Sequence, residues 1–261
     1  MKEREMGYGT ELMGLWAERL AQELAGSVGR ALEGTGETGI AFSGGIDSAL
    51  LALLAARGGT TLTLYTVGLP GARDLEASAK AAKALGLGDR HAVLEPGGDE
   101  VLGAAERIRS LVPGATLLQV SFLTPAFIVF ERAGNHTILT GDGADELFGG
   151  YHRYLAMDQA GLAASLEADA EELVSRGFKR NLRLADVAGK RLLAPYLDPQ
   201  VVGLARSIPA GLKVHDGERK AVLRRAAAVL GLPPELCSLP KRAAQYGSGI
   251  HAFLTKKRFM Q

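Results

Sequence analysis

The chain has 261 residues, with 30 Lys and Arg, 29 Asp and Glu and a single cysteine. Its length suits one large domain or one domain with an appendage, and 47% hydrophobic with 23% charged residues predicts a folded core. The net charge of +1 argues against a dedicated nucleic-acid-binding protein. One cysteine excludes a disulfide framework and a thiolate-rich metal site.

The most apolar stretches of the sequence are too short to cross a membrane. The run 48–56 is far below the roughly 20 residues that a spanning helix needs. Residues 1–10 are charged and lack the apolar segment of a signal peptide. We therefore expect a cytoplasmic protein that does not associate with membranes.

Short apolar runs alternate with helical patterns through the first half of the chain. Apolar side chains at 3.6-residue spacing predict a first helix at 12–32, which ends at the glycines that follow it. After it we expect strands at 39–42, 60–67, 91–94 and 137–140, and helices at 47–57, 74–85 (with Asp74 as N-cap), 99–111 and 122–132. This alternation is typical of an α/β fold, in which helices flank a parallel sheet and ligands bind at the carboxyl ends of its strands.

Strand patterns stop near Gly150, and the remaining sequence is typical of helices. We expect these at 161–176, 179–191, 198–207 and 218–230, with prolines between them. The predicted organisation is an N-terminal helix at 1–35, an α/β core at 36–155 and a helical C-terminal part at 156–261.

Residues 43–48 read Ser-Gly-Gly-Ile-Asp-Ser and lie between the first predicted strand and the next helix. Adjacent glycines allow a sharp turn and a close approach to a ligand, and the free N–H groups of the following helix favour an anion. The loop lacks the Gly-Lys-Ser/Thr ending of an ATPase P-loop. Asp47 would repel a phosphate unless it holds a divalent metal. The alternative is an ordinary strand-to-helix turn.

Residues 140–151 follow the last predicted strand of the core, so we expect them at the same edge of the sheet. Four glycines stand here with three carboxylates, Asp142, Asp145 and Glu146. Such a concentration of charge is costly unless a cation is near. Asp145 would join Asp47 on one Mg²⁺. A calcium-binding loop is the competing interpretation, but the spacing does not match an EF-hand.

Both loops resemble those of a known family. The string at 43–48 resembles the pyrophosphate-binding loop of the ATP pyrophosphatase superfamily, whose members cleave ATP to AMP and pyrophosphate. The string at 141–151 resembles the asparagine synthetase signature Gly-Glu-Gly-(Ser/Ala)-Asp-Glu-Leu-Phe-Gly-Gly-Tyr, with Asp142 for the first Glu. Four further motifs extend the resemblance over about residues 36–250. Residues 194–198 resemble the family's Val-Pro-Phe-Leu-Asp, and Lys220 with 223–225 resembles Gly-x-x-Lys-x-x-Leu-Arg. Residues 232–236 resemble Leu-Pro-x-x-Ile, and residues 240–242 resemble Arg-x-Lys.

The resemblance implies an adenine nucleotide alpha hydrolase-like fold and an AMP-forming ligase. In that family the side-chain carboxylate of aspartate attacks the α-phosphorus of ATP, and ammonia then attacks the acyl-adenylate. Asp142 would act as general base and Lys220 would stabilise charge on the α-phosphate, while Asp47 and Asp145 would hold Mg²⁺. The implied ATP-binding residues are Ala41, Ser43, Gly44, Gly45, Asp47, Ser48, Val67, Gly68 and Gly141.

One departure from the family concerns the source of ammonia. The family's glutaminase domain has a Cys nucleophile exposed as residue two, whereas Lys2 stands here and the sole cysteine is Cys237. We therefore expect ammonia that is free or supplied by a separate glutaminase subunit. A homo-oligomer also stays open.

A second departure concerns the substrate. Arg191 and Leu193 replace the family's Glu and Arg, and Leu182 replaces its Asp, at positions that line the substrate side; Asp186 and Lys190 would have to compensate. Aspartate is the expected small-molecule carboxylate. The alternatives are an AMP-forming ligase for another carboxylate or amine, as in β-lactam synthetases, or an ATP-binding relative without activity. The β-lactam branch has a Tyr at the position of Asp142, so the carboxylate favours the asparagine synthetase side.

Overall fold

The computed structural model describes residues 2–238, 247–257 and 259. The chain divides into two compact units. The sheet unit contains the described residues of Gly34–Thr140, Phe178–Leu193 and Arg242–Gln261. The helical unit contains those of Met1–Glu33, Gly141–Gly177 and Ala194–Lys241.

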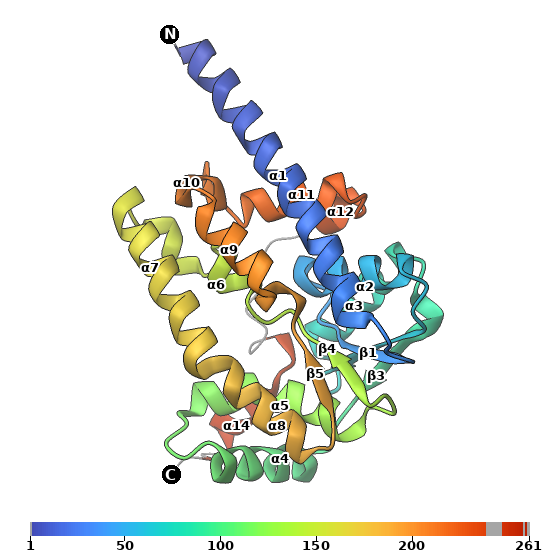
Figure 1. Ribbon diagram of the computed structural model, residues 1–261. Coiled ribbons are helices and arrows are strands. Elements are labelled where there is room, and N and C mark those ends of the chain that lie inside the picture. The colour runs from blue at the N-terminus through green and yellow to red at the C-terminus, as the bar shows by residue number, and fades with distance from the viewer. Residues whose placement is uncertain (1, 239–246, 258, 260–261) are drawn as a thin grey trace. The chain divides into compact units, whose positions relative to one another are not determined.

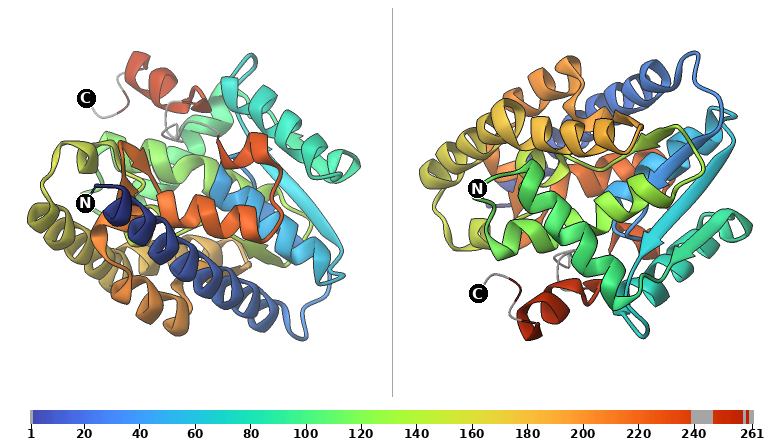
Figure 2. Two further views of the ribbon diagram at one scale, coloured as in Figure 1. Left: turned by 90° about the horizontal axis from the view of Figure 1, so that it is seen from above. Right: turned by 90° about the horizontal axis from the view of Figure 1, so that it is seen from below.

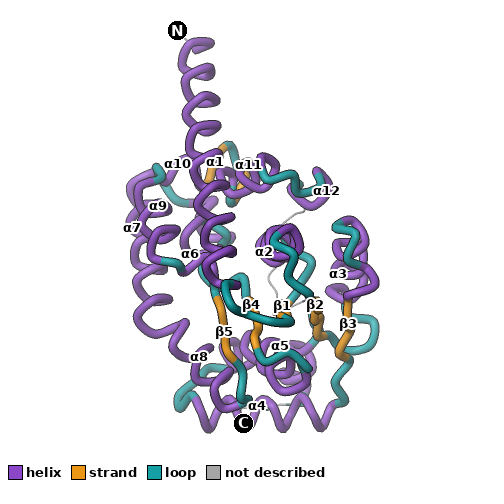
Figure 3. The backbone as a smooth tube through the Cα atoms, turned by 45° about the vertical axis from the view of Figure 1, so that its right-hand side comes forward, coloured by secondary structure: helices purple, strands orange, loops and turns teal. Residues whose placement is uncertain are grey.

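The sheet unit, in which Figure 1 labels β1, β3, β4 and β5, is built on five parallel strands. Their order is β3-β2-β1-β4-β5 (Figure 3). Ile40, in the central strand, pairs with Leu64 on one side and Leu139 on the other, and all three are fully buried. Buried runs of this kind are expected where both faces of a parallel sheet are covered. The strands are β1 (Thr38–Ala41), β2 (Leu62–Val67), β3 (His91–Leu94), β4 (Thr137–Leu139) and β5 (Arg191–Leu193).

Helices cover both faces of this sheet (Figure 3). One face carries α2 (Ile46–Arg57) and α3 (Arg73–Ala84), and the other carries α4 (Gly98–Leu111), α5 (Leu117–Arg132) and α8 (Phe178–Val187). α14 (Ile250–Lys256) packs against α5, and a 3-10 turn, η1 (Gly88–Arg90), precedes β3. The α/β fold with a flanked parallel sheet is therefore confirmed.

In the helical unit, α1 (Lys2–Leu32) lies beside α11 (Ala221–Val229), as Figure 2 shows. Leu20, Leu24 and Val28 form its buried stripe, as the helical spacing predicts. No described helix is long and apolar enough to span a membrane. The other elements are α6 (Ala144–Phe148), η2 (His152–Ala156), α7 (Gln159–Glu172), the π-helical η3 (Leu173–Gly177), η4 (Pro195–Leu197), α9 (Pro199–Ser207), α10 (Ala210–Lys213), β6 (Val214–His215), β7 (Glu218–Arg219) and α12 (Pro234–Cys237).

The prediction that strands stop near Gly150 is wrong. The helix expected at 179–191 ends as α8 at Val187, the chain turns at Gly189 with a φ of 68°, and β5 follows. β5 pairs in parallel with β4 and completes the sheet. The helix expected at 218–230 begins only at Ala221, because residues 218–219 form β7 opposite β6. Helices nevertheless dominate the C-terminal half.

Several helix starts also differ from prediction. Asp74 is not the N-cap of α3, which is Ala72; Asp74 lies in the first turn, where a carboxylate also favours the helix dipole. α5 begins at Leu117 rather than at 122, since Thr116 and Gln119 form a reciprocal capping box. The first helix begins at Lys2 rather than at 12.

Candidate functional site

The loop at 43–48 is closed by its two serines. Ser48 Oγ accepts a hydrogen bond from the Ser43 N–H (3.3 Å) and donates to the Gly45 carbonyl oxygen (3.2 Å). Ser43 Oγ in turn accepts from the Gly45 N–H (3.3 Å). Ser48 is buried, whereas Ser43 is exposed. The loop is therefore an ordered structure with one hydroxyl at the surface.

Gly44 fits this loop for two reasons. Its φ is 74°, a left-handed conformation that disfavours any other residue. A Cβ at this position would also lie 2.7 Å from Ser78 Cα of α3. The backbone of the loop thus touches the backbone of a neighbouring helix.

The loop runs directly into the N-terminus of α2. Gly45 is the N-cap and makes no side-chain capping hydrogen bond. The first backbone N–H groups of a helix have no partner within the helix and carry partial positive charge. Asp47, half-buried, lies in this first turn. The local arrangement suits an anion, as the sequence predicts.

The other predicted nucleotide contacts of the sheet unit begin at the same edge. Ala41 ends β1 and Val67 ends the adjacent parallel strand β2, so both lie at the carboxyl edge from which the loop at 43–48 leaves. Gly68 is buried, and a Cβ there would lie 2.8 Å from Leu75 Cδ2. The predicted ATP-binding residues of the sheet unit therefore all lie at the carboxyl edge of its sheet.

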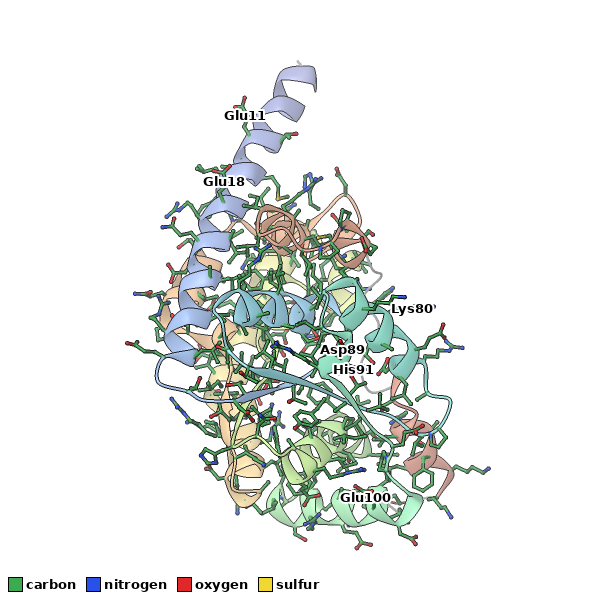
Figure 4. The ribbon with its side chains drawn as sticks, turned by 90° about the vertical axis from the view of Figure 1, so that its right-hand side faces the viewer. Glu11, Glu18, Lys80, Asp89, His91 and Glu100 are labelled. Atoms are coloured by element: carbon green, nitrogen blue, oxygen red, sulfur yellow. The ribbon has the colours of Figure 1, made fainter. Side chains whose placement is uncertain are left out.

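A hydrogen-bond chain beneath this loop was not predicted. Thr66 Oγ1 donates to the Phe42 carbonyl oxygen (2.6 Å) and lies 2.9 Å from His91 Nε2 (His91 is labelled in Figure 4). Because the only hydroxyl proton of Thr66 goes to Phe42, the His91 Nε2–H must donate to Thr66. Burial lowers the pKa of His91, which favours this neutral ring. The chain fixes the residue that precedes the loop.

The second loop, in the helical unit, forms a short helix between glycines. Gly143 is the N-cap of α6 with a φ of 97°, and Gly149 is its C-cap with a φ of 77°. A Cβ on Gly143 would lie 2.6 Å from Leu197 Cδ2. Gly141 accepts a hydrogen bond from the Ala144 N–H (3.3 Å), and Asp142 is half-buried between them in sequence. Glycines are therefore favoured at 143 and 149 because both positions have a left-handed backbone conformation.

The centre of the helical unit is an ion pair between Asp145 and Lys220. The two side chains meet with Asp145 Oδ1 2.6 Å from Lys220 Nζ. Lys220 is fully buried, while the Asp145 side chain is 24% exposed. A Cβ on Gly150 would overlap both side chains, at 1.8 Å from Asp145 Oδ1 and 2.5 Å from Lys220 Cε. The two residues named separately by the sequence therefore act on each other.

The turn that presents Lys220 is held by two arginines that the sequence did not single out. Lys220 itself has a φ of 59°, which is strained for a residue with a Cβ. Arg219 donates to the Gly150 carbonyl oxygen (2.9 Å), and the buried Arg224 donates to the Arg219 carbonyl oxygen (2.9 Å) and to that of Cys237. The Leu-Arg of the motif after Lys220 was the signal that could have identified Arg224.

Glu146, the third carboxylate of the loop, has a different environment. Its carboxylate accepts a hydrogen bond from the Tyr151 hydroxyl. Burial raises the pKa of Glu146, and nearby Asp145 raises it further. Burial and the Glu146 carboxylate likewise raise the pKa of Tyr151. No cluster of three or more His, Cys, Asp or Glu suited to a metal occurs among the described residues.

Three residues that the sequence named with the substrate side lie on α8 or around the start of β5. Lys190 Nζ donates to the carbonyl oxygens of Ala133 (2.6 Å) and Asn135 (2.9 Å), just before β4. Arg191 begins β5 and its N–H donates to His136 (2.9 Å). Since the strands are parallel, this is the amino edge of the sheet, opposite the loop at 43–48. Asp186 is exposed on α8.

We expect the Lys190→Met variant to be less stable without a change in substrate KM. Loss of hydrogen bonds from a charged donor costs about 1.5–3 kcal/mol, which urea unfolding will measure. Lys179→Met, on the exposed surface of α8, is the matched control and should change stability little. If the variant instead had a raised KM for the carboxylate and unchanged stability, Lys190 would contribute to substrate binding.

The single cysteine does not have the environment of a nucleophile. Cys237, at the end of α12, is partly buried, and its Sγ contacts the Leu232 carbonyl oxygen at 3.5 Å. Burial raises the pKa of this thiol, whereas a reactive cysteine needs a lowered one. The Arg-x-Lys likeness at 240–242 lies outside the described residues.

Comparison with known proteins extends the motif evidence over most of the chain. A family model described as asparagine synthase matches residues 19–194 and 179–259. A Methanocaldococcus jannaschii protein named for glutamine-hydrolyzing asparagine synthetase 1 is 30% identical over 92% of this chain and 51% of its own length. Asparagine synthetase 1 of Saccharomyces cerevisiae is 28% identical over 81% of this chain and 45% of its own. The mouse asparagine synthetase domain-containing protein 1 is 41% identical over 46% of this chain and 20% of its own. The chain thus spans about half the length of the first two.

Proposed function

The chain belongs to the asparagine synthase family, and from that premise we propose that it adenylates the side-chain carboxylate of aspartate and transfers ammonia to it. The family assignment supports an ATP-dependent amide ligase in general. The observation that carries the finer proposal is the ordered glycine loop at 43–48, which enters the N-terminus of α2 at Gly45.

In the first step, a carboxylate oxygen of aspartate attacks the α-phosphorus of ATP. The bond to pyrophosphate breaks, and β-aspartyl-AMP forms. The proposed roles are binding of pyrophosphate by the loop at 43–48, of adenine and ribose by Ala41, Val67 and Gly68, and stabilisation of the α-phosphate by Lys220. Gly141 is kept as a further ATP contact. Mg²⁺, which would neutralise phosphate charge, is proposed to bind carboxylate oxygens of Asp47 and Asp145.

In the second step, ammonia attacks the carbonyl carbon of the adenylate, and AMP leaves. Asp142 is proposed to take the proton from the incoming ammonium as general base. Its side chain is one methylene shorter than that of the Glu in the family signature. Ammonia is proposed to be free or supplied by a glutaminase subunit.

An exchange assay separates the two steps. With ATP, Mg²⁺ and aspartate, labelled pyrophosphate should enter ATP, and addition of ammonium chloride should give asparagine. Asp142→Asn should retain exchange but lose most asparagine synthesis, because only the second step needs the base. If pyrophosphate exchange does not depend on aspartate, the proposal that aspartate is the substrate is wrong.

A different carboxylate is the second candidate. Leu193 ends β5 at the carboxyl edge of the sheet, where the family motif has an Arg, so a cation is replaced by an apolar side chain. Exchange supported by a less charged acid in place of aspartate would favour this candidate. Absence of ATP binding in the presence of Mg²⁺ would favour a non-catalytic relative.

A further inference from the structure

A cavity is lined entirely by residues of the helical unit. Its volume is about 220 Å³, far more than the roughly 10–15 Å³ that one water needs. Residues of α6, α7, α9 and α10 line it, together with the segment between α9 and α10. Its charged lining residues are Glu146, Glu167, Arg206 and Lys213.

Lys213 is the unusual member of this lining. The residue is only 6% exposed, and its Nζ makes no hydrogen bond or ion pair with the described part of the chain. Partial burial of an ammonium group is costly. Accordingly, burial lowers its pKa to about 8, against the opposing effect of Glu167.

The acidic groups of the cavity are already engaged. Glu167 pairs with Arg206 at 2.8 Å, and both side chains are about half exposed. Glu146 accepts the hydrogen bond of Tyr151. Lys213 is therefore the cation of the lining that forms no ion pair with a described carboxylate, and it lies next to an apolar wall formed by Leu147, Ala163, Leu166, Ala170, Ile208, Pro209 and Ala210.

We propose that this cavity binds a small organic carboxylate, with the Lys213 ammonium group holding the carboxylate and the apolar wall holding its carbon chain. None of the lining residues is a predicted ATP-binding residue, and the proposal does not depend on the proposed reaction. Glu146 and Leu147 belong to α6, the helix that carries Asp145. A bound carboxylate would thus contact that helix.

Titration of the full chain with sodium propionate, sodium succinate or sodium phosphate tests the proposal. The alanine methyl groups of the protein are labelled with ¹³C and followed by NMR. The carboxylates should shift the methyl signals of Ala163, Ala170 and Ala210, which line the cavity, but not that of Ala81, buried in α3. Phosphate should bind more weakly, because it gains nothing from the apolar wall.

Lys213→Met removes the ammonium group but keeps a long side chain, and should weaken carboxylate binding at least about tenfold. Lys80→Met is the control: this lysine of α3 is exposed, as Figure 4 shows, and its loss should change nothing. Wild-type shifts that appear only outside the cavity, or binding that Lys213→Met leaves intact, would overturn the proposal. Phosphate binding as tight as that of succinate would overturn the choice of a carboxylate.

The pH dependence gives a test that needs no variant. Raising the pH from 7 to 9.5 should weaken binding on the order of tenfold or more, because the carboxylate prefers the protonated amine. Glu146, Glu167 and Arg206 are the other charged groups of the lining, and His215 belongs to β6, which follows α10. Binding that is unchanged over this range would exclude Lys213 as the carboxylate partner.

Discussion

Replacing Lys220 with Met should lower the rate of ATP–pyrophosphate exchange by roughly 10²–10³-fold, the usual loss when one fixed electrostatic donor is removed from a site. Lys220 is fully buried and carries its charge on a turn with a φ of 59°. The surrounding hydrogen bonds of Arg219 and Arg224 keep that turn in place. A side chain held so firmly is preorganised to meet developing charge on a phosphate.

The same variant also tests a structural role, because Lys220 pairs with Asp145. Removing one partner of a buried ion pair costs about 3–5 kcal/mol, since the other charge is left unpaired. We expect Asp145→Asn to be the more destabilising change, because the ammonium group left behind is fully buried whereas the Asp145 side chain is 24% exposed. Urea unfolding of both single variants will measure the difference.

The double variant Asp145→Asn/Lys220→Met separates the two roles. It leaves no unpaired charge, so its stability should recover most of the loss seen in the single variants. Exchange should stay as low as in Lys220→Met. Lys80→Met, far from this pair in the sequence and exposed, controls for the loss of a lysine. Recovery of exchange in the double variant would show that the pair serves folding alone.

The sequence predicts the sheet unit well where the signals are local. Apolar runs and glycine turns locate β1 to β4 within one or two residues, since both determine local backbone conformation. β5 could not be recognised in this way. It is three residues long, begins with Arg191, and owes its conformation to pairing with β4, which is a contact between distant parts of the sequence.

In the candidate site, too, local features could be predicted from the sequence, whereas contacts between distant residues could not. The glycine spacing predicts both loops, and the structure gives Gly44 and Gly143 the left-handed backbone that such loops need. The pairing of Asp145 with Lys220 joins residues far apart in the chain, so no local pattern reveals it. The hydrogen bonds of Lys190 also join distant positions in the chain, because its two carbonyl partners precede β4.

Gly44→Ala should have the second large effect, on both stability and nucleotide use. A Cβ adds about 1–2 kcal/mol for the left-handed backbone, and its approach to 2.7 Å from Ser78 Cα forces the loop or α3 to move, which costs a further 1–3 kcal/mol or so. The displaced loop can no longer direct its N–H groups at one position. Exchange should therefore fall on the order of 100-fold.

Gly59→Ala is the matched control for this variant. Gly59 follows α2 with a φ of 78°, but a Cβ there would meet no atom within 4 Å. It should therefore carry the backbone cost of about 1–2 kcal/mol and leave exchange at the wild-type rate. If Gly44→Ala and Gly59→Ala lose equal stability and both retain exchange, the close contact with Ser78 has no bearing on nucleotide binding. If only Gly44→Ala loses exchange while remaining folded, the position of the loop backbone is what the nucleotide requires.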